Sequence, residues 1–232
     1  MITINNREIG EGNPIYIVAE MGINHNGSLD IALKMVEEAA KSGVDAVKIQ
    51  IVDADRNYAK NSMSYTIFKK VELEIDKWRK VVELAKNLNL DIFSTFAHPG
   101  DLVIAEELEF PVIKISSSNL TNFPLLKAAA VTGKPILLST GMSYINEIDE
   151  AIRYIEQNGN DRIGILQCTA LYPTPPKDVN LLAIETLRKV FSYTVGFSDH
   201  TKGICSAIAS VALGAKIIEK HFTLDRSMEG SD

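Results

Sequence analysis

The feature that most constrains the fold is an alternation of short, β-rich apolar runs with helical patterns along the whole chain. Eight runs predict strands, at residues 15–20, 45–51, 91–95, 112–116, 135–140, 163–168, 193–197 and 216–221. Helical patterns lie between them, for example at residues 28–43, 75–89, 122–133 and 144–159. Strands that alternate with helices at this spacing pair in parallel. Eight of them favour a closed (β/α)8 TIM barrel over an open sheet.

The remaining segments are consistent with one barrel domain at residues 1–232. Residues 2–14 predict a small hairpin before the first strand, and the mixed charges of residues 52–74 are typical of a solvated loop over the barrel mouth. Only residues 222–232 follow the last strand, so we expect the eighth helix of the barrel to be missing. Glycines stand where three of the helices should end, at Gly43, Gly133 and Gly159.

Composition excludes several classes of protein. Apolar residues make up 46% and charged residues 23% of the chain, which excludes disorder, collagen and a coiled coil. The net charge of -6 argues against a nucleic-acid partner, because such a partner needs a basic face. The polar N-terminus is unlike a signal peptide, and no apolar run is long enough for a membrane span. Cys168 and Cys205 are expected to be buried free thiols of a cytoplasmic protein.

Polar residues gather at the carboxyl ends of the predicted strands, where a TIM barrel carries its chemistry. Lys48 and Lys114 lie within strands, and a buried, unpaired ammonium is costly. Two such lysines indicate an anion held in the barrel mouth. Hydroxyl groups that could donate to its oxygens follow neighbouring strands, at Ser117, Ser139 and Ser198. Glycine-rich dinucleotide and P-loop motifs are absent from the sequence.

Two histidines make a metal site possible. His200 and His221 end the seventh and eighth predicted strands, which are neighbours in a closed barrel, and Glu20 ends the first. Imidazole suits Mn, Zn, Fe or Cu, but such histidines can equally be ordinary core or surface residues. Nucleophilic catalysis has weaker support. Cys168 has no base beside it in the sequence, while Lys114 could form a Schiff base as an alternative to holding an anion.

The motifs at the strand ends resemble the sialic acid synthase family. They are AEMGINHNG at 19–27, VKIQ at 47–50, FST at 93–95, KISSSNLTN at 114–122, STGM at 139–142, YPTP at 172–175, GFSDHTKG at 196–203 and EKHFTLDRSMEGSD at 219–232. Enzymes of this family condense phosphoenolpyruvate with an acetamido sugar, such as N-acetylmannosamine, to form a nonulosonic acid and release phosphate. The resemblance spans the chain, with the motifs in the family's order.

The resemblance implies roles for individual residues. Those implied to hold phosphoenolpyruvate are Lys48, Thr95, Lys114, Ser117, Ser139 and Ser198. Those implied to contact the sugar are Glu20, Gln50, Tyr172 and Asp232. His200 and His221 would hold a divalent metal, Mn²⁺ or Mg²⁺. The implied catalytic group is Glu20, Lys48, Lys114, His200 and His221.

The sequence departs from the family pattern in three places. Asn119 stands where many members have an acid that meets the sugar, and Ala170 stands where several have a polar residue. The family's C-terminal antifreeze-like domain, which completes the sugar site of a homodimer, is not in this sequence. Two alternatives therefore stay open. One is a phosphoenolpyruvate aldolase that makes a 3-deoxy sugar acid, and the other is a catalytically impaired barrel that only binds a ligand or a partner.

Overall fold

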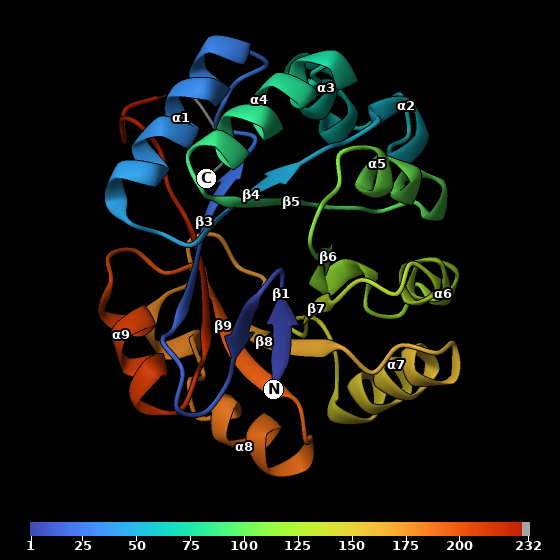
Figure 1. Ribbon diagram of the computed structural model, residues 1–232, viewed down its shortest axis with the longest axis vertical. Helices are drawn as coiled ribbons and strands as arrows, with labels where there is room; N and C mark the ends of the chain where they lie inside the picture. Colours follow the sequence, from blue (N-terminus) through green and yellow to red (C-terminus); the bar gives the residue numbers. More distant parts are fainter. Residues whose placement is uncertain (229–232) are drawn as a thin grey trace. The chain divides into compact units, whose positions relative to one another are not determined.

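In the computed structural model, which describes residues 1–228 (Figure 1), eight parallel strands form a closed barrel in the order β10-β3-β4-β5-β6-β7-β8-β9. The strands are β3 (Tyr16–Gly22), β4 (Ala46–Gln50), β5 (Asp91–Thr95), β6 (Ile113–Ile115), β7 (Ile136–Ser139), β8 (Ile163–Cys168), β9 (Thr194–Asp199) and β10 (Ile217–His221). The α-helices are α1 (Leu29–Ser42), α2 (Ala54–Asn57), α3 (Met63–Val71), α4 (Ile75–Asn87), α5 (Leu102–Glu107), α6 (Phe123–Val131), α7 (Ile145–Gln157), α8 (Ala183–Val190) and α9 (Cys205–Ala212). The predicted TIM barrel is confirmed.

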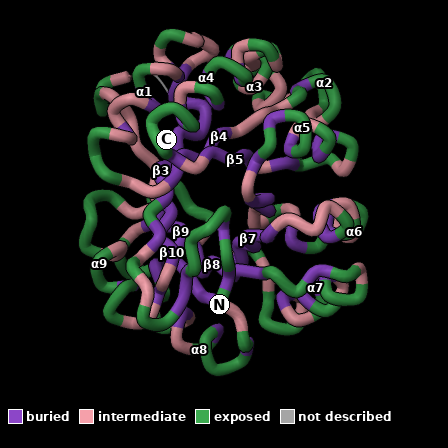
Figure 2. The backbone as a smooth tube through the Cα atoms, viewed as in Figure 1, coloured by how far each residue is buried: buried purple, intermediate pink, exposed green. Residues whose placement is uncertain are grey.

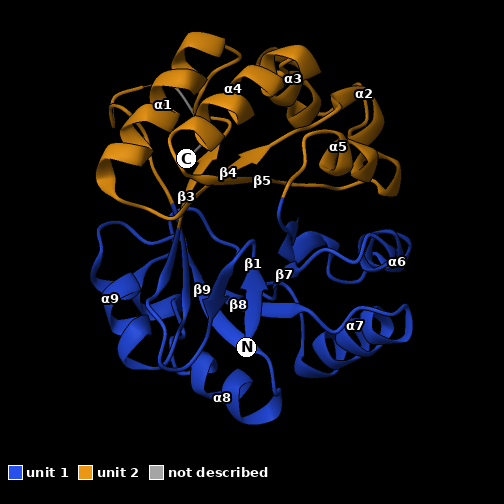
Figure 3. Ribbon diagram, viewed as in Figure 1, with its two compact units in different colours: residues 1–17, 111–220 blue, residues 18–110, 221–232 orange. Residues whose placement is uncertain are grey.

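The chain divides into two compact units (Figure 3). Unit 1 comprises residues 1–17 and 111–220, and unit 2 comprises residues 18–110 and 221–232. Unit 1 contains strands β6 to β9 with helices α6 to α9, whereas unit 2 contains β4 and β5 with helices α1 to α5.

The predicted hairpin is present in unit 1 as the antiparallel pair β1 (Ile2–Ile4) and β2 (Arg7–Ile9). Ile2, Ile4 and Ile9 are fully buried, so the hairpin has an apolar face that packs inward. The hydroxyl of Thr194, the first residue of β9, donates a hydrogen bond to the Ile9 carbonyl at 3.2 Å. The hairpin is therefore attached where β9 begins, at the opposite end of that strand from its polar residues.

The sequence also marks where helices end. The three glycines predicted to close helices all have positive φ, 77° at Gly43, 64° at Gly133 and 88° at Gly159. The N-cap of α1 is Ser28, whose hydroxyl accepts from the Ile31 amide. The buried side of the helix is formed by residues spaced three and four apart, Ala32, Met35, Val36 and Ala39.

Residues 52–74 differ from the expected loop, because they contain the helices α2 and α3. Each helix has an N-cap side chain. The Asp53 carboxylate accepts from the Arg56 amide at 3.1 Å, and the Ser62 hydroxyl accepts from the Tyr65 amide at 3.1 Å. Capping satisfies amide groups that would otherwise need water, and this stabilises helices as short as these.

Burial follows the barrel, with the strands buried and the outward sides of the helices exposed (Figure 2). Cys168 is buried and Cys205 is exposed, so the prediction of a buried thiol is wrong for Cys205. The reason is that α9 turns an apolar surface outward. Ile204 and Ile208 are each 64% exposed, whereas the buried residue of α9 is Ser210. Among the described helices, none has the length and apolar character needed to cross a membrane.

Candidate active site

One group of predicted site residues meets at the carboxyl ends of strands in unit 2. Lys48 and Gln50 are two residues apart on β4, so their side chains leave the same face of the strand. The Glu20 carboxylate on β3 contacts both side chains. The Lys48 Nζ lies 2.7 Å from Glu20 Oε2, and Gln50 Nε2 donates to Glu20 Oε1 at 3.1 Å. Lys48 Nζ also donates to Thr95 Oγ1 on β5 at 3.1 Å.

This arrangement is a buried ion pair inside a hydrogen-bond network. The Glu20 side chain is 0% exposed and the Lys48 side chain 6%. Charges taken out of water are tolerated only when they are paired and hydrogen-bonded, and here both conditions hold. The network fixes the Lys48 ammonium at the strand ends, where an anionic oxygen could accept hydrogen bonds from this ammonium and from the Thr95 hydroxyl.

A second group of predicted residues meets in unit 1. The Lys114 Nζ on β6 donates to Ser139 Oγ on β7 at 2.7 Å. Lys114 Nζ also lies 3.4 Å from Glu219 Oε1 on β10, and that oxygen accepts from Ser198 Oγ on β9 at 2.8 Å. All four side chains are buried. The unit therefore holds a lysine, a glutamate and two hydroxyls in one network.

Glu219 is a site residue that the sequence reasoning missed. It lies directly opposite Ser198 in the β9–β10 register. Its position within a core strand is the signal that could identify it, because a glutamate there is as unusual as Lys48 or Lys114. Its carboxylate supplies the countercharge that offsets the free-energy cost of burying the Lys114 ammonium.

His200 is oriented by its neighbours. Its Nδ1 lies 2.7 Å from the Thr169 carbonyl oxygen, and its Nε2 lies 3.3 Å from Ser198 Oγ. The Tyr172 ring stacks on the imidazole with ring centroids 4.1 Å apart. Asp199, the preceding residue, has a structural role. Its carboxylate binds Lys220 Nζ at 2.8 Å and accepts from the Thr201 amide.

The loop after β6 carries Ser117 and Asn119. Ser117 Oγ accepts from the Gly141 amide at 3.0 Å and lies 3.0 Å from Cys168 Sγ. The Asn119 amide group donates to Ser116 Oγ at 3.0 Å, and its oxygen accepts from Asn122 at 3.1 Å. Asn119 thus stabilises its own loop in this structure.

The predicted metal ligands belong to different units, His200 to unit 1 and His221 to unit 2, so their pairing stays a prediction. The β9–β10 register pairs Lys220 with Asp199, and each histidine directly follows one of these two residues. Among residues 1–228, no group of three or more histidine, cysteine, aspartate or glutamate side chains is arranged to hold a metal ion. Asp232 lies outside the described residues.

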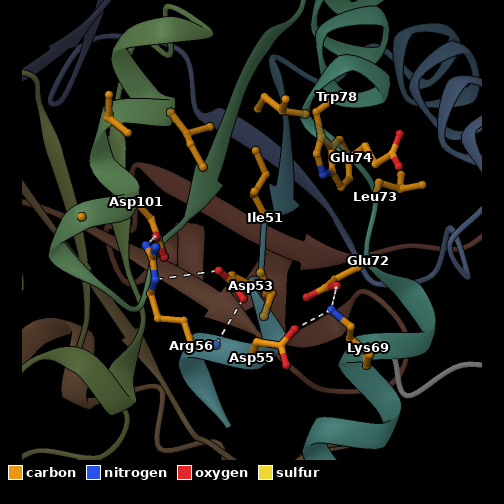
Figure 4. Close-up of a pocket in the computed structure, with 15 residues that line it drawn as sticks. Ile51, Asp53, Asp55, Arg56, Lys69, Glu72, Leu73, Glu74, Trp78 and Asp101 are labelled. Carbon is orange, nitrogen blue, oxygen red and sulfur yellow. Dashed lines mark hydrogen bonds and ion pairs between the residues drawn. The ribbon is translucent and has the colours of Figure 1, made fainter.

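Unit 2 also has a cavity of about 760 Å³ near α2, α3 and the start of α4 (Figure 4). Most of its charged side chains are paired with one another. Arg56 binds Asp101 and lies 3.8 Å from Asp53, and Lys69 binds Asp55 at 2.8 Å. The described lining contains none of the predicted site residues. We therefore place the candidate site at the strand ends and not in this cavity.

Comparison with known proteins identifies the family. The model of the NeuB family matches residues 35–232. The chain belongs to the NeuB family.

Relatives support this membership over nearly the whole chain. An uncharacterized protein of Methanocaldococcus jannaschii is 46% identical over 100% of this chain and 68% of its own length. The N,N'-diacetyllegionaminic acid synthase of Campylobacter jejuni is 40% identical over 93% of this chain and 70% of its own length. The crystal structure of the N-acetylneuraminic acid synthetase of Leptospira borgpetersenii, in complex with citrate, superposes with a TM-score of 0.95 at 35% identity and covers 99% of this chain and 80% of that one.

We expect His25, which lies just after β3 in this NeuB-family chain, to make the free energy of unfolding depend on pH. Its ring is buried edge-on against Trp78, with centroids 5.2 Å apart, and its Nδ1 accepts from the Gly27 amide at 3.1 Å. Burial lowers the pKa of His25 from 6.5 to about 4. Between these values the unfolded chain binds the proton and the folded chain does not. The free energy of unfolding should therefore fall by about 3 kcal/mol as the pH drops from above 6.5 to about 4.

Urea unfolding measured across this pH range tests the prediction in a His25→Asn variant, which keeps an acceptor for Gly27. The variant should lose most of the pH dependence. His98 is a matched control, because its Nδ1 likewise accepts from an amide two residues on, Gly100, but at an exposed position. A His98→Asn variant should keep the wild-type slope. An unchanged slope in the His25 variant would contradict the assignment.

Proposed function

We propose that this chain condenses phosphoenolpyruvate with an open-chain acetamido sugar to give a nonulosonic acid and phosphate. The observation that carries the proposal is the pair of buried strand lysines, each hydrogen-bonded to a strand-end hydroxyl. Lys48 donates to Thr95 in unit 2, and Lys114 donates to Ser139 in unit 1. Fixed ammonium and hydroxyl donors of this kind suit a small substrate with carboxylate and phosphate groups. Relatives named as synthases of legionaminic, pseudaminic and sialic acids support the same chemistry.

In the proposed reaction, the enol carbon of phosphoenolpyruvate attacks the aldehyde carbon of the sugar and forms a carbon–carbon bond. The aldehyde oxygen takes a proton and becomes a hydroxyl. Water adds to the carbon that carries the phosphate oxygen, and phosphate leaves as that C–O bond breaks. Lys48, Thr95, Lys114, Ser117, Ser139 and Ser198 are proposed to bind phosphoenolpyruvate. Glu20, Gln50, Tyr172 and Asp232 are proposed to contact the sugar.

We also propose that His200 and His221 hold a divalent cation, Mn²⁺ or Mg²⁺. The surroundings of His200 fit this role. Metal-binding histidines usually donate their other ring N–H to a carbonyl group, and Nδ1 of His200 lies 2.7 Å from the Thr169 oxygen. When bound, the cation would supply Lewis-acid polarisation of the aldehyde oxygen. Thr169 and the stacked Tyr172 ring would hold the imidazole in place.

Mass spectrometry of products tests the proposal. The chain is incubated with phosphoenolpyruvate, Mn²⁺ and each of several acetamido sugars, namely N-acetylmannosamine, its 6-phosphate and a diacetamido trideoxy hexose. A product with the mass of sugar plus pyruvate, together with an equal amount of released phosphate, is expected for at least one. Arabinose 5-phosphate is the matched alternative, and turnover of that sugar alone would replace the proposal with a 3-deoxy sugar acid synthase. Calorimetric binding of phosphoenolpyruvate without product from any sugar would instead favour the impaired barrel.

A further inference from the structure

The hydroxyl of Ser117 has two neighbours that together control which way its hydrogen bond can point. The Gly141 amide donates to Ser117 Oγ at 3.0 Å, and Cys168 Sγ lies 3.0 Å from the same oxygen. The three residues come from the ends of β6, β7 and β8, all within unit 1. Cys168 is 7% exposed.

A serine hydroxyl has one proton and two lone pairs, and a thiol can donate or accept. The Gly141 amide occupies one lone pair. If Ser117 donated its proton to Cys168 Sγ, the oxygen would present only a lone pair to a ligand, and an anion would be repelled. If the Cys168 S–H donates, both lone pairs are filled and the hydroxyl proton is left for the ligand.

We infer that Cys168 is a positioning residue whose thiol donates to Ser117 Oγ and thereby makes the Ser117 hydroxyl a donor to an anionic substrate oxygen. The inference rests on the proposed function, in which Ser117 binds phosphoenolpyruvate. It also accounts for the place of the thiol in the fold. Cys168 has no base among its described hydrogen-bond partners, so the arrangement suits a fixed thiol better than a nucleophile.

Packing holds the thiol in this position. A Cβ atom added to Gly141 would lie 2.6 Å from Cys168 Sγ and 2.8 Å from the Cys168 carbonyl oxygen. The absence of a side chain at Gly141 is therefore what lets the sulfur approach, and the same close approach lets the Gly141 amide reach Ser117. Gly141 and Cys168 act together on one hydroxyl.

Calorimetric titration with phosphoenolpyruvate tests the effect on binding. Cys168→Ala should weaken the affinity about fivefold to tenfold, the usual effect of one hydrogen bond. Cys168→Ser restores a donor of similar size and should stay within about threefold of wild type. In a Ser117→Ala background, Cys168→Ala should have no further effect, because its acceptor is gone. Wild-type affinity in Cys168→Ala, or an equal loss in both backgrounds, would overturn the inference.

Infrared spectroscopy of the S–H stretch tests the hydrogen bond without any ligand. In a Cys205→Ser chain, the one remaining thiol is that of Cys168. Its band should lie at the lower frequency of a hydrogen-bonded donor and should move up when Ser117 is changed to Ala. A band that does not move overturns the inference. If the band moves but the protein binds no phosphoenolpyruvate, the proposed function is overturned, whereas the hydrogen bond between Cys168 and Ser117 is supported.

Discussion

A Lys114→Met variant is expected to bind phosphoenolpyruvate about 100-fold more weakly than the wild-type chain, a loss of about 2.7 kcal/mol. The Lys114 ammonium is held by Ser139 and Glu219 in a buried site, where a charge-assisted hydrogen bond to an anion is strong. Methionine has a similar length and no charge. Isothermal calorimetry gives the affinity.

Two further variants separate binding from folding. Lys114→Gln can still donate to the hydroxyl or the carboxylate, so it should fold even if the methionine variant does not, and it should lose most of the affinity as well. Lys127 lies exposed on α6 in the same unit, and Lys127→Met should bind as wild type does. If folded Lys114→Met loses less than about tenfold, the anion role of Lys114 is wrong.

Removing Lys48 is expected to lower the free energy of unfolding by about 3–5 kcal/mol, because a Lys48→Met change leaves the Glu20 carboxylate buried without its countercharge. Urea denaturation measures the loss. The double variant Glu20→Gln, Lys48→Met removes both charges and should recover more than half of it. Arg153→Met breaks an exposed ion pair with Asp149 on α7 and should change stability little. A Lys48→Met chain as stable as the Arg153 variant would show that the pair does not support the fold.

The strands were the most predictable part of this protein. A strand with both faces covered must be apolar on both, so runs such as ILLS in β7 differ clearly from the amphipathic helices beside them. The helices α2 and α3 were less predictable. Their amphipathic pattern is short, and the evidence for them was local, in the capping residues Asp53 and Ser62.

Side-chain roles were harder to predict than strand positions. Lys48 and Lys114 could be singled out from the sequence because burying a charge in a core strand is costly unless it is paired. The structure gives each lysine a carboxylate partner. Glu219 has the same signal, but it also begins the EKHFTLDR motif, which draws attention to His221 instead. Cys168 could not have been assigned from sequence, because its contact with Ser117 joins residues 51 positions apart. The exposure of Cys205 depends on which side of α9 faces outward, and that helix has the apolar Ile208 on its exposed side and Ser210 on its buried side.

The β1–β2 hairpin, which contacts the first residue of β9, offers a point at which the chain can be attached to a surface. Ser198 lies near the other end of β9, about 13 Å from Thr194 at the usual rise of a strand. The Met1 residue is 75% exposed, so a biotin or an affinity tag can be coupled there without entering the buried hairpin face. Because Ile2 pairs with Ile9, an attachment at Met1 lies on the Thr194 side of β9, away from Ser198. Sensor-based titrations can therefore be oriented through Met1.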